Sequence, residues 1–504
     1  MRRPLTILAL LCLAAQAPAH VHAQAPAQAH TLRIGMRDDP DILDPTLSRT
    51  YVGTLVMTAL CDKLFDFDEA QAIVPVLATG YESVDPTTLL IRIRPGVRFH
   101  NNEPLDAAAV KYTLDRHANL PGSFRRNEIG AMDRVEVVDP LTVRVVLKQP
   151  FSPFIAVLTD RAGMVVSPRA AEAAGKEFGL HPVCAGPFRF TERVAQDRIV
   201  LDRFPGYWDA ARIHYDRVIY RVIPDSSIRL ANLRAGALDI GEVAPLDVPA
   251  AEQDPKLAVV SVPSLGYGAL TINLAAPSPL ARDPRVRMAL QLSIDRAALS
   301  QVVFAGLYAP NAQAVSAASP YYVPAIAIPP HDIAAARVLL QQAGLTPPVR
   351  VDLLVTNTPQ GVQAAEVIQA MAAEAGFDMR VVASEFGAVI AATNRGDFQV
   401  TLGGWSGLLD PDSNAYAFLH TGSALNIAKY AKPAADALLE QARMEADPAK
   451  RRALYEQLWR QVQTDLPLIY LWTTRNIVGV SRGVQGVRLL ANGLLPLQDV
   501  RPRP

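Results

Sequence analysis

Residues 397–414 combine small, aromatic and acidic side chains in a spacing suited to ligand capture. They read Asp-Phe-Gln-Val-Thr-Leu-Gly-Gly-Trp-Ser-Gly-Leu-Leu-Asp-Pro-Asp-Ser-Asn, which predicts a strand that ends in a glycine-rich polar loop. Gly403 and Gly404 remove two side chains beside Trp405, so a ligand can approach main-chain groups while the indole forms a flat apolar wall. We expect the floor of a binding pocket at Gly403, Gly404, Trp405 and Ser406. The alternative is an ordinary strand end with a core tryptophan.

Catalytic motifs do not accompany this stretch. The sequence has no phosphate-cradling Gly-x-x-x-x-Gly-Lys loop and no Cys-x-x-Cys pair, and its nine histidines are scattered. We therefore expect a binding protein and not an enzyme, with no cofactor and no metal site.

Composition favours a multidomain protein with a small ligand. At 504 residues, half of them apolar, the chain exceeds a single hydrophobic core, so two or three domains are expected. Basic and acidic residues balance at 49 each, which argues against a nucleic-acid partner or a polybasic membrane surface. Small neutral or zwitterionic ligands fit this balance better.

The N-terminus predicts export from the cytoplasm. Arg2 and Arg3 precede an apolar run over residues 5–15, and small residues follow near Ala23, which is the pattern of a signal peptide spanning 1–23. The run is too short to cross a membrane, and no later segment reaches about 18 apolar residues. We expect a mature protein in the periplasm without a lipid anchor at Cys12.

Two cysteines remain in the expected mature chain, Cys61 and Cys184. In an oxidising compartment two thiols pair more often than they stay free, so a Cys61–Cys184 disulfide is predicted. Two separate buried thiols or a reactive cysteine are the alternatives.

Hydrophobic periodicity predicts alternating strands and helices along the chain. Capping signals at Asp106 and at Asp283-Pro284 predict helix starts. Strands are expected at 31–36, 89–93, 97–100, 349–355 and 379–383, and helices at 50–64, 226–235, 332–344 and 360–376.

Several motifs, taken in order, resemble the extracellular solute-binding proteins of peptide and nickel ABC importers. They cover the whole expected mature chain and lie at residues 93–116, 186–190, 203–208, 283–296, 404–412 and 465–470.

The resemblance implies an α/β fold of the periplasmic binding protein type II kind, with two lobes, mixed sheets and an additional inserted domain. It divides the chain into a discontinuous first domain, an inserted second domain and a third domain that forms the second lobe, with a hinge near 267 and 473. These domains span 24–66, 184–266 and 474–504 for the first, 67–183 for the second and 267–473 for the third.

Dipeptide receptors of this family carry two charged clamps that this sequence lacks. Leu408 stands where they place an aspartate for the ligand's amino terminus, and Asn357 stands where they place an arginine for its carboxylate. A dipeptide amine buried without a partner costs several kcal/mol, so the same binding mode is doubtful. Asp410 or Asp412 is a candidate substitute, the alternative being a turn in which both cap their own backbone.

Other candidate contacts lie outside this loop. Tyr267 starts the strand that crosses between lobes and is expected to face Trp405, and Tyr51 opens the first helix. Arg229 and Arg234 are read as a solvated or lobe-bridging face, with an anion contact as the alternative, and Asn273 as structural.

The sequence thus predicts a monomeric periplasmic receptor that captures a peptide-like or other small organic solute and delivers it to an ABC permease in the inner membrane. The same fold with a non-peptide ligand, such as an opine, a sugar or a metal chelate, is the first alternative. A periplasmic hydrolase is the second.

Overall fold

A computed structural model describes residues 30–503 of the chain. The predicted signal peptide and its cleavage site lie outside these residues. Along the described part of the chain, none of the helices has the length and apolar character that a bilayer crossing requires.

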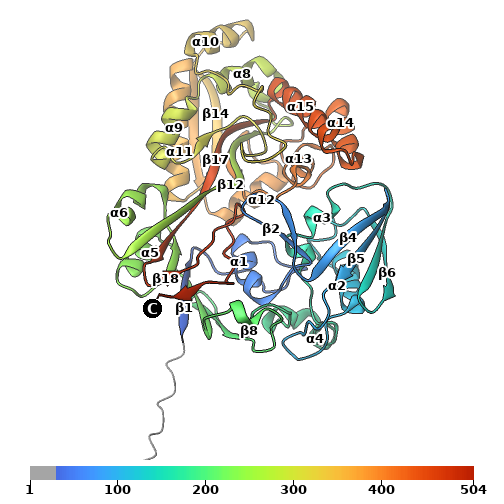
Figure 1. Cartoon of the computed structure of the whole chain (residues 1–504). Coiled ribbons are helices and arrows are strands. Elements are labelled where there is room, and N and C mark those ends of the chain that lie inside the picture. The colour runs from blue at the N-terminus through green and yellow to red at the C-terminus, as the bar shows by residue number, and fades with distance from the viewer. Residues whose placement is uncertain (1–29, 504) are drawn as a thin grey trace, which may run out of the picture.

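One mixed sheet runs through both lobes and confirms the predicted α/β architecture. Its strand order is β15-β14-β16-β12-β17-β11-β1-β10-β9-β8, and β13 joins it at β17. The long strands β12 (Leu257–Ile272) and β17 (Leu468–Ser481) pair along their length and pass from the lower to the upper lobe in Figure 1. Their register shifts between Pro263 and Tyr267, beside the predicted crossing point at 267.

The first lobe is built around the amino-terminal strand. The strand β1 lies between β10 and β11 and runs parallel to both. The Thr50 side chain accepts a hydrogen bond from Gly53 N and caps α1, which ends at Leu60, four residues earlier than predicted. The elements of this lobe are β1 (Thr31–Met36), β8 (Phe188–Val194), β9 (Arg198–Arg203), β10 (Arg217–Val222), β11 (Ile240–Glu242), α1 (Tyr51–Leu60), α5 (Ser226–Arg234) and α6 (Val248–Glu252).

The second lobe packs helices on both faces of the sheet. Alternate residues of β17 show this, because Ile469 and Leu471 join the core with α8, α9, α10 and α11, whereas Leu468 and Tyr470 join the core with α13, α14 and α15. The elements are β13 (Ala309–Pro310), β14 (Val349–Thr356), β15 (Phe377–Ser384), β16 (Val400–Trp405), α7 (Pro279–Arg282), α8 (Pro284–Leu292), α9 (Arg296–Phe304), α10 (Ile333–Gln342), α11 (Pro359–Ala375), α12 (Phe386–Arg395), α13 (Pro411–Leu419), α14 (Pro433–Met444) and α15 (Pro448–Asp465).

A separate four-stranded antiparallel sheet, in the order β4-β5-β7-β6, forms the inserted part. As predicted, the Asp106 side chain caps α2 by accepting from Ala109 N. The predicted strand at 97–100 is wrong: only an isolated bridge joins Arg98 to Pro104, because a tight turn follows at once. The elements are β4 (Ala78–Asp85), β5 (Thr88–Ile93), β6 (Met132–Asp139), β7 (Thr142–Leu147), α2 (Ala107–Asn119), α3 (Phe154–Val157) and α4 (Pro168–Ala174), with the short pairs β2 (Phe65–Phe67) and β3 (Ile73–Pro75), and β18 (Val484–Gln485) and β19 (Arg501–Pro502), elsewhere.

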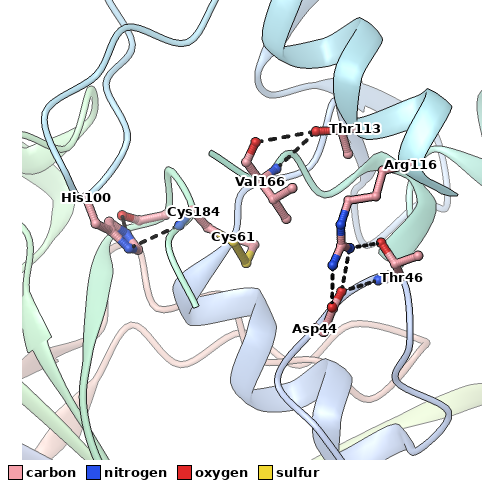
Figure 2. The surroundings of a disulfide bond; sticks show 9 residues. Asp44, Thr46, Cys61, His100, Thr113, Arg116, Val166 and Cys184 are labelled. Atoms are coloured by element: carbon pink, nitrogen blue, oxygen red, sulfur yellow. Dashed lines mark hydrogen bonds and ion pairs between the residues drawn. A yellow bond between two sulfur atoms is a disulfide. The ribbon is translucent and has the colours of Figure 1, made fainter. Parts of the chain in front are cut away.

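The predicted Cys61–Cys184 disulfide is confirmed, with an S–S distance of 2.03 Å. Figure 2 shows it between the end of α1 and the segment that returns from the insertion, where His100 N donates to Cys184 O at 2.8 Å. Nearby, Arg116 of α2 donates to both Asp44 carboxylate oxygens at 2.9 and 2.7 Å. The disulfide therefore joins two segments of the first lobe at the base of the insertion, and the Arg116–Asp44 ion pair attaches the insertion to that lobe.

The hydrophobic cores follow the lobes approximately, and Leu64, Phe65 and Ala185 of the predicted first domain pack in the core of the inserted part. Met164, Val166 and Phe178 pack in the core of the first lobe, although the sequence places them in the inserted domain. The chain thus starts to return to the first lobe before residue 184.

Candidate functional site

The carboxyl ends of strands from the two lobes face one another at the lobe junction. The strand β11 runs antiparallel to β17, and β1 runs parallel to β11, so both point toward the second lobe. The strand β16 runs antiparallel to β12, and β14 runs parallel to β16, so both point toward the first lobe. Residues at and just beyond these strand ends, including those at 403–410, are therefore placed to touch a molecule held between the lobes.

Gly403 exposes its backbone as predicted. A Cβ atom at this position would meet no atom within 4 Å, and the residue is exposed. Gly404 is also exposed, but its Cβ would lie 2.9 Å from the Tyr267 carbonyl oxygen. Both positions thus leave main-chain groups accessible, and only Gly404 faces a close neighbour.

Trp405 is half-buried and firmly positioned. Its Nε1 donates to Asn414 Oδ1 at 2.9 Å, and its ring packs edge-on against Phe418 with centroids 5.1 Å apart. Asn414 also binds the loop, because its Oδ1 accepts from Leu408 N and its Nδ2 donates to Leu408 O, both at 2.8 Å. Asn414, which sequence reasoning missed, therefore holds the indole and the loop together, while Ser406 remains exposed.

Tyr267 must be corrected from a ligand contact to a core residue. It lies opposite Trp405 in the register of β12 and β16, as expected, but its side chain is only 2% exposed. Its ring packs against Tyr470 at a centroid distance of 4.9 Å. The strand β12 begins at Leu257, so the expectation that Tyr267 starts it is wrong, and the packing of α13 to α15 over this face decided the burial.

The two aspartates of the loop, Asp410 and Asp412, each form an ion pair with an arginine of the second lobe. Asp410 accepts from Arg451 at 2.6 and 2.7 Å, and Asp412 accepts from Arg443 at 2.8 and 3.0 Å. Asp410 also caps α13 by accepting from Asp412 N at 2.9 Å. The capped turn is therefore the better description, and the charge of Asp410 is already compensated before any ligand arrives.

Asn357 and Leu408 differ in their surroundings. Continuing the register of β14 with β16 places Asn357 opposite Gly404, and Asn357 is exposed. Leu408 lines a cavity of about 20 Å³, enough for about one water molecule. This cavity lies between the inserted part and the second lobe and is lined by Glu128, Ala156, Val157, Thr159, Asp160, Leu408, Asp410 and Ser413.

The lobes also touch directly near this cavity. Ser152 N donates to Arg443 O at 2.8 Å, and Ser152 Oγ donates to Glu445 O at 2.6 Å. A larger hollow of about 440 Å³ lies between α14 and α15 and is lined by none of the predicted contacts.

Charged side chains at the end of β1 and β11 were missed by sequence reasoning. The Arg37 guanidinium is half exposed and lies 5.3 Å from the centroid of the Tyr51 ring. Glu242 is the largest cause that raises the pKa of Arg37. No spacing signal marked these residues, because Arg37 opens a loop of turn-forming residues that is polar in any fold.

Tyr51 is placed at this junction, but its hydroxyl is already used. It donates to Gly493 O at 2.8 Å, and burial raises the pKa of the phenol. Its ring faces Arg37, so Tyr51 is a support for that side chain.

The remaining candidates are structural. Arg229 is buried and donates to Ile223 O and Pro224 O at 2.6 and 2.8 Å, while Arg234 pairs with Asp254 at 3.4 Å. Asn273 Nδ2 donates to Gly396 O and Phe398 O, as a structural role predicts.

One hydrolase-like pattern, Gly479-Val480-Ser481-Arg482-Gly483, occurs at the end of β17. A nucleophile elbow needs a strand that turns into a helix. Here Ser481 Oγ accepts from Gly483 N at 3.3 Å in a turn that leads to β18. The pattern is therefore a turn between strands.

Comparisons with known proteins agree with this geometry. The family model for bacterial extracellular solute-binding proteins, family 5 Middle, matches residues 72–426. The glutathione-binding protein GsiB of Pectobacterium atrosepticum is 31% identical over 471 residues, covering 91% of each chain. GsiB of Salmonella paratyphi A is 31% identical over 459 residues, covering 88% of this chain and 89% of its own.

Solved structures share the fold. The periplasmic binding protein DppA of Helicobacter pylori, in complex with the peptide STSA, superposes with a TM-score of 0.84 at 24% identity, covering 94% of this chain and 99% of its own. AgaA of A. tumefaciens R10, in complex with agropinic acid, gives a TM-score of 0.82 at 24% identity with the same coverage.

Proposed function

Since this chain belongs to family 5 of the bacterial extracellular solute-binding proteins, the receptors of ABC importers, we propose that it captures a glutathione-like peptide between its lobes and delivers it to a permease. The observation that carries the proposal is the open backbone at Gly403 beside the fixed indole of Trp405, at the point where strand ends from both lobes meet. Main-chain hydrogen bonds and a flat apolar wall suit a peptide unit.

Lobe closure completes the proposed site. Among the strands of residues 30–503, only β12 and β17 continue the large sheet from one lobe into the other, and the register of this pair shifts beside Tyr267. A hinge needs few residues that absorb a rotation, and this irregularity supports one near 267 and 473. We propose the domain limits 24–66, 184–266 and 474–504, then 67–183, then 267–473 from the family resemblance, with Met164, Val166 and Phe178 also packing against the first domain.

The peptide class is supported by the relatives named as glutathione-binding proteins. The alternative of an opine is favoured by one observation, the uncharged Leu408 and Asn357 at the positions of the family's dipeptide clamps. A neighbour in fold holds agropinic acid. A peptide whose charged groups bind to other residues at the lobe junction would agree both with the glutathione-binding relatives and with the uncharged Leu408 and Asn357.

The proposed role is that of a receptor and not of an enzyme, in the periplasm, as a monomer without a nucleic-acid partner. The family role, the signal-like N-terminus and the balanced charge of 49 basic and 49 acidic residues support it.

Thermal-shift measurements on the mature protein test the ligand class. The panel contains glutathione, di- and tripeptides, an opine and a sugar. We expect stabilisation by glutathione or a tripeptide, because a ligand that binds only the folded protein raises its stability. Stabilisation by the opine alone would refute the peptide proposal and support an opine as the ligand.

A further inference from the structure

Two opposite charges follow the parallel strands of the first lobe at the lobe junction. Arg37 comes directly after β1, and Glu242 is the last residue of β11. Continuing the register of these strands by one residue places Met36 opposite Glu242, and neighbouring strands are about 4.8 Å apart. Both residues stand at strand ends that point toward the second lobe, and Glu242 is the largest electrostatic influence on Arg37, so a guanidinium and a carboxylate meet at this end of the sheet.

Within the part of the chain that the structure describes, neither the Arg37 guanidinium nor the Glu242 carboxylate is used in a hydrogen bond. The nearest carboxylate to Arg37 is Asp38, at 4.0 Å from Nε, which is beyond hydrogen-bond distance. Within residues 30–503 the side chains of Arg37 and Glu242 have no hydrogen bond. Buried or half-buried charges are normally paired, so this pair has free donor and acceptor capacity for a ligand.

The position of Arg37 is nevertheless fixed. The Tyr51 ring lies 5.3 Å below the guanidinium, and the Tyr51 hydroxyl is anchored on Gly493 O. Tyr308 of the second lobe lies within the electrostatic influence of both Arg37 and Glu242. The charged pair therefore borders both lobes.

The charged pair is separated from Trp405 both along and across the sheet. Along β17, Glu242 is level with Val478, and Trp405 is level with Thr473 through Tyr267. These five residues correspond to about 17 Å of strand, and the three strand spacings from β11 to β16 add about 14 Å across the sheet. An extended tripeptide spans roughly 10 Å, so the Arg37 and Glu242 side chains must reach over part of the distance and lobe closure must supply the rest.

We propose that Arg37 and Glu242 bind the α-amino-carboxylate group of the ligand, Arg37 through the carboxylate and Glu242 through the ammonium. A γ-glutamyl peptide carries both groups on one carbon atom, whereas an ordinary peptide carries them at opposite ends. The site therefore selects γ-glutamyl peptides, and it explains how the uncharged Leu408 is tolerated, because Glu242 binds the ligand's ammonium group. This inference rests on the proposed function.

Calorimetric titration of the mature protein with γ-Glu-Cys-Gly and α-Glu-Cys-Gly tests it. The wild type should prefer the γ-linked peptide about tenfold or more, since each charge-assisted hydrogen bond contributes strongly in a closed site. Arg37→Gln and Glu242→Gln should each reduce this preference to about threefold or less. Arg37→Lys should be intermediate, because it keeps the charge and loses the planar fork.

Matched controls lie on outer strands of the same sheet, Arg217 at the start of β10 and Glu192 in the edge strand β8. Arg217→Gln and Glu192→Gln remove half-exposed charges from β10 and β8, and they should leave the preference unchanged. Circular-dichroism melts confirm that each variant is folded. Equal binding of both peptides by the wild type, or an undiminished preference in the Arg37 and Glu242 variants, would overturn the inference. Failure of the wild type to bind any peptide would instead refute the proposed function.

Discussion

Arg451 and Asp410 form a two-point ion pair inside the second lobe, with NH1 to Oδ2 at 2.6 Å and NH2 to Oδ1 at 2.7 Å. Asp410 also caps the helix that carries Asn414, and Asn414 in turn fixes Trp405. The pair therefore connects α15 to the loop whose backbone lies open to the lobe junction.

Removal of one partner should be costly. Asp410→Asn leaves the Arg451 guanidinium buried without its counter-charge, and we expect a loss of about 3–5 kcal/mol in the free energy of unfolding. Urea denaturation measures this loss. The double variant Asp410→Asn with Arg451→Met should lose less than Asp410→Asn alone, because no uncompensated charge remains. A single variant as stable as the wild type would show that the pair does not hold the loop.

The two adjacent glycines should respond differently to the same substitution. Gly403→Leu projects into open space and should leave the melting temperature within a few degrees of the wild type. Gly404→Leu brings a Cβ to 2.9 Å from the Tyr267 carbonyl oxygen and should lower it clearly, since the strand backbone must shift. Melting curves followed by circular dichroism distinguish them, and the reverse order would contradict the exposure described for Gly403.

The disulfide should stabilise the first lobe. Cys61 and Cys184 are 123 residues apart in sequence, and their replacement by serine should cost about 2–5 kcal/mol of stability. The wild type under reducing conditions should approach the variant in urea denaturation. Identical stability with and without reductant, with the thiols shown to be free, would refute this role.

Acid should destabilise the protein through His117. Burial lowers the pKa of His117 to about 3, whereas the unfolded chain has a value near 6.5. The folded state thus disfavours the proton, so its stabilising contribution is complete above pH 6.5 and is lost as the pH falls toward 3, by up to about 1.4 kcal/mol per pH unit. His117→Gln should lack this dependence.

Comparing the wild type with His117→Gln separates the pH dependence due to His117 from the opposite pH dependence due to Asp62. Burial raises the pKa of Asp62 to about 7, so its contribution is complete below about pH 4 and is lost as the pH rises toward 7. Urea denaturation of the wild type and of His117→Gln between pH 4 and pH 7 gives the difference. A constant difference would contradict the burial of a neutral imidazole.

Local sequence signals predicted helix and strand positions well where contacts between residues near in sequence determine them. Capping aspartates such as Asp106 marked helix starts, and alternation marked β1, because these depend on neighbouring residues alone. The strand at 97–100 failed because a turn at Asn102, in a left-handed conformation, ends the extended segment before a partner strand can pair.

The site was predictable only in part. The exposure of Gly403 beside Trp405 was predicted because a double glycine beside an indole is a backbone signal, and the role of both residues in binding stays a prediction. Tyr267 was misassigned because helices from residues 411–465 cover its face, and no local pattern reports that packing. Arg37 and Glu242 were missed because strand pairing between residues about 200 positions apart brings them together.

Calorimetric titration of the wild type and of Gly403→Leu with glutathione measures whether the open backbone at Gly403 forms the floor of the binding site. The wild type should bind one glutathione per chain with saturation, and Gly403→Leu should bind it at least tenfold more weakly, because its side chain would occupy the space over the open backbone. Equal affinities, or the absence of binding by the wild type to glutathione and to every tripeptide tried, would contradict this prediction.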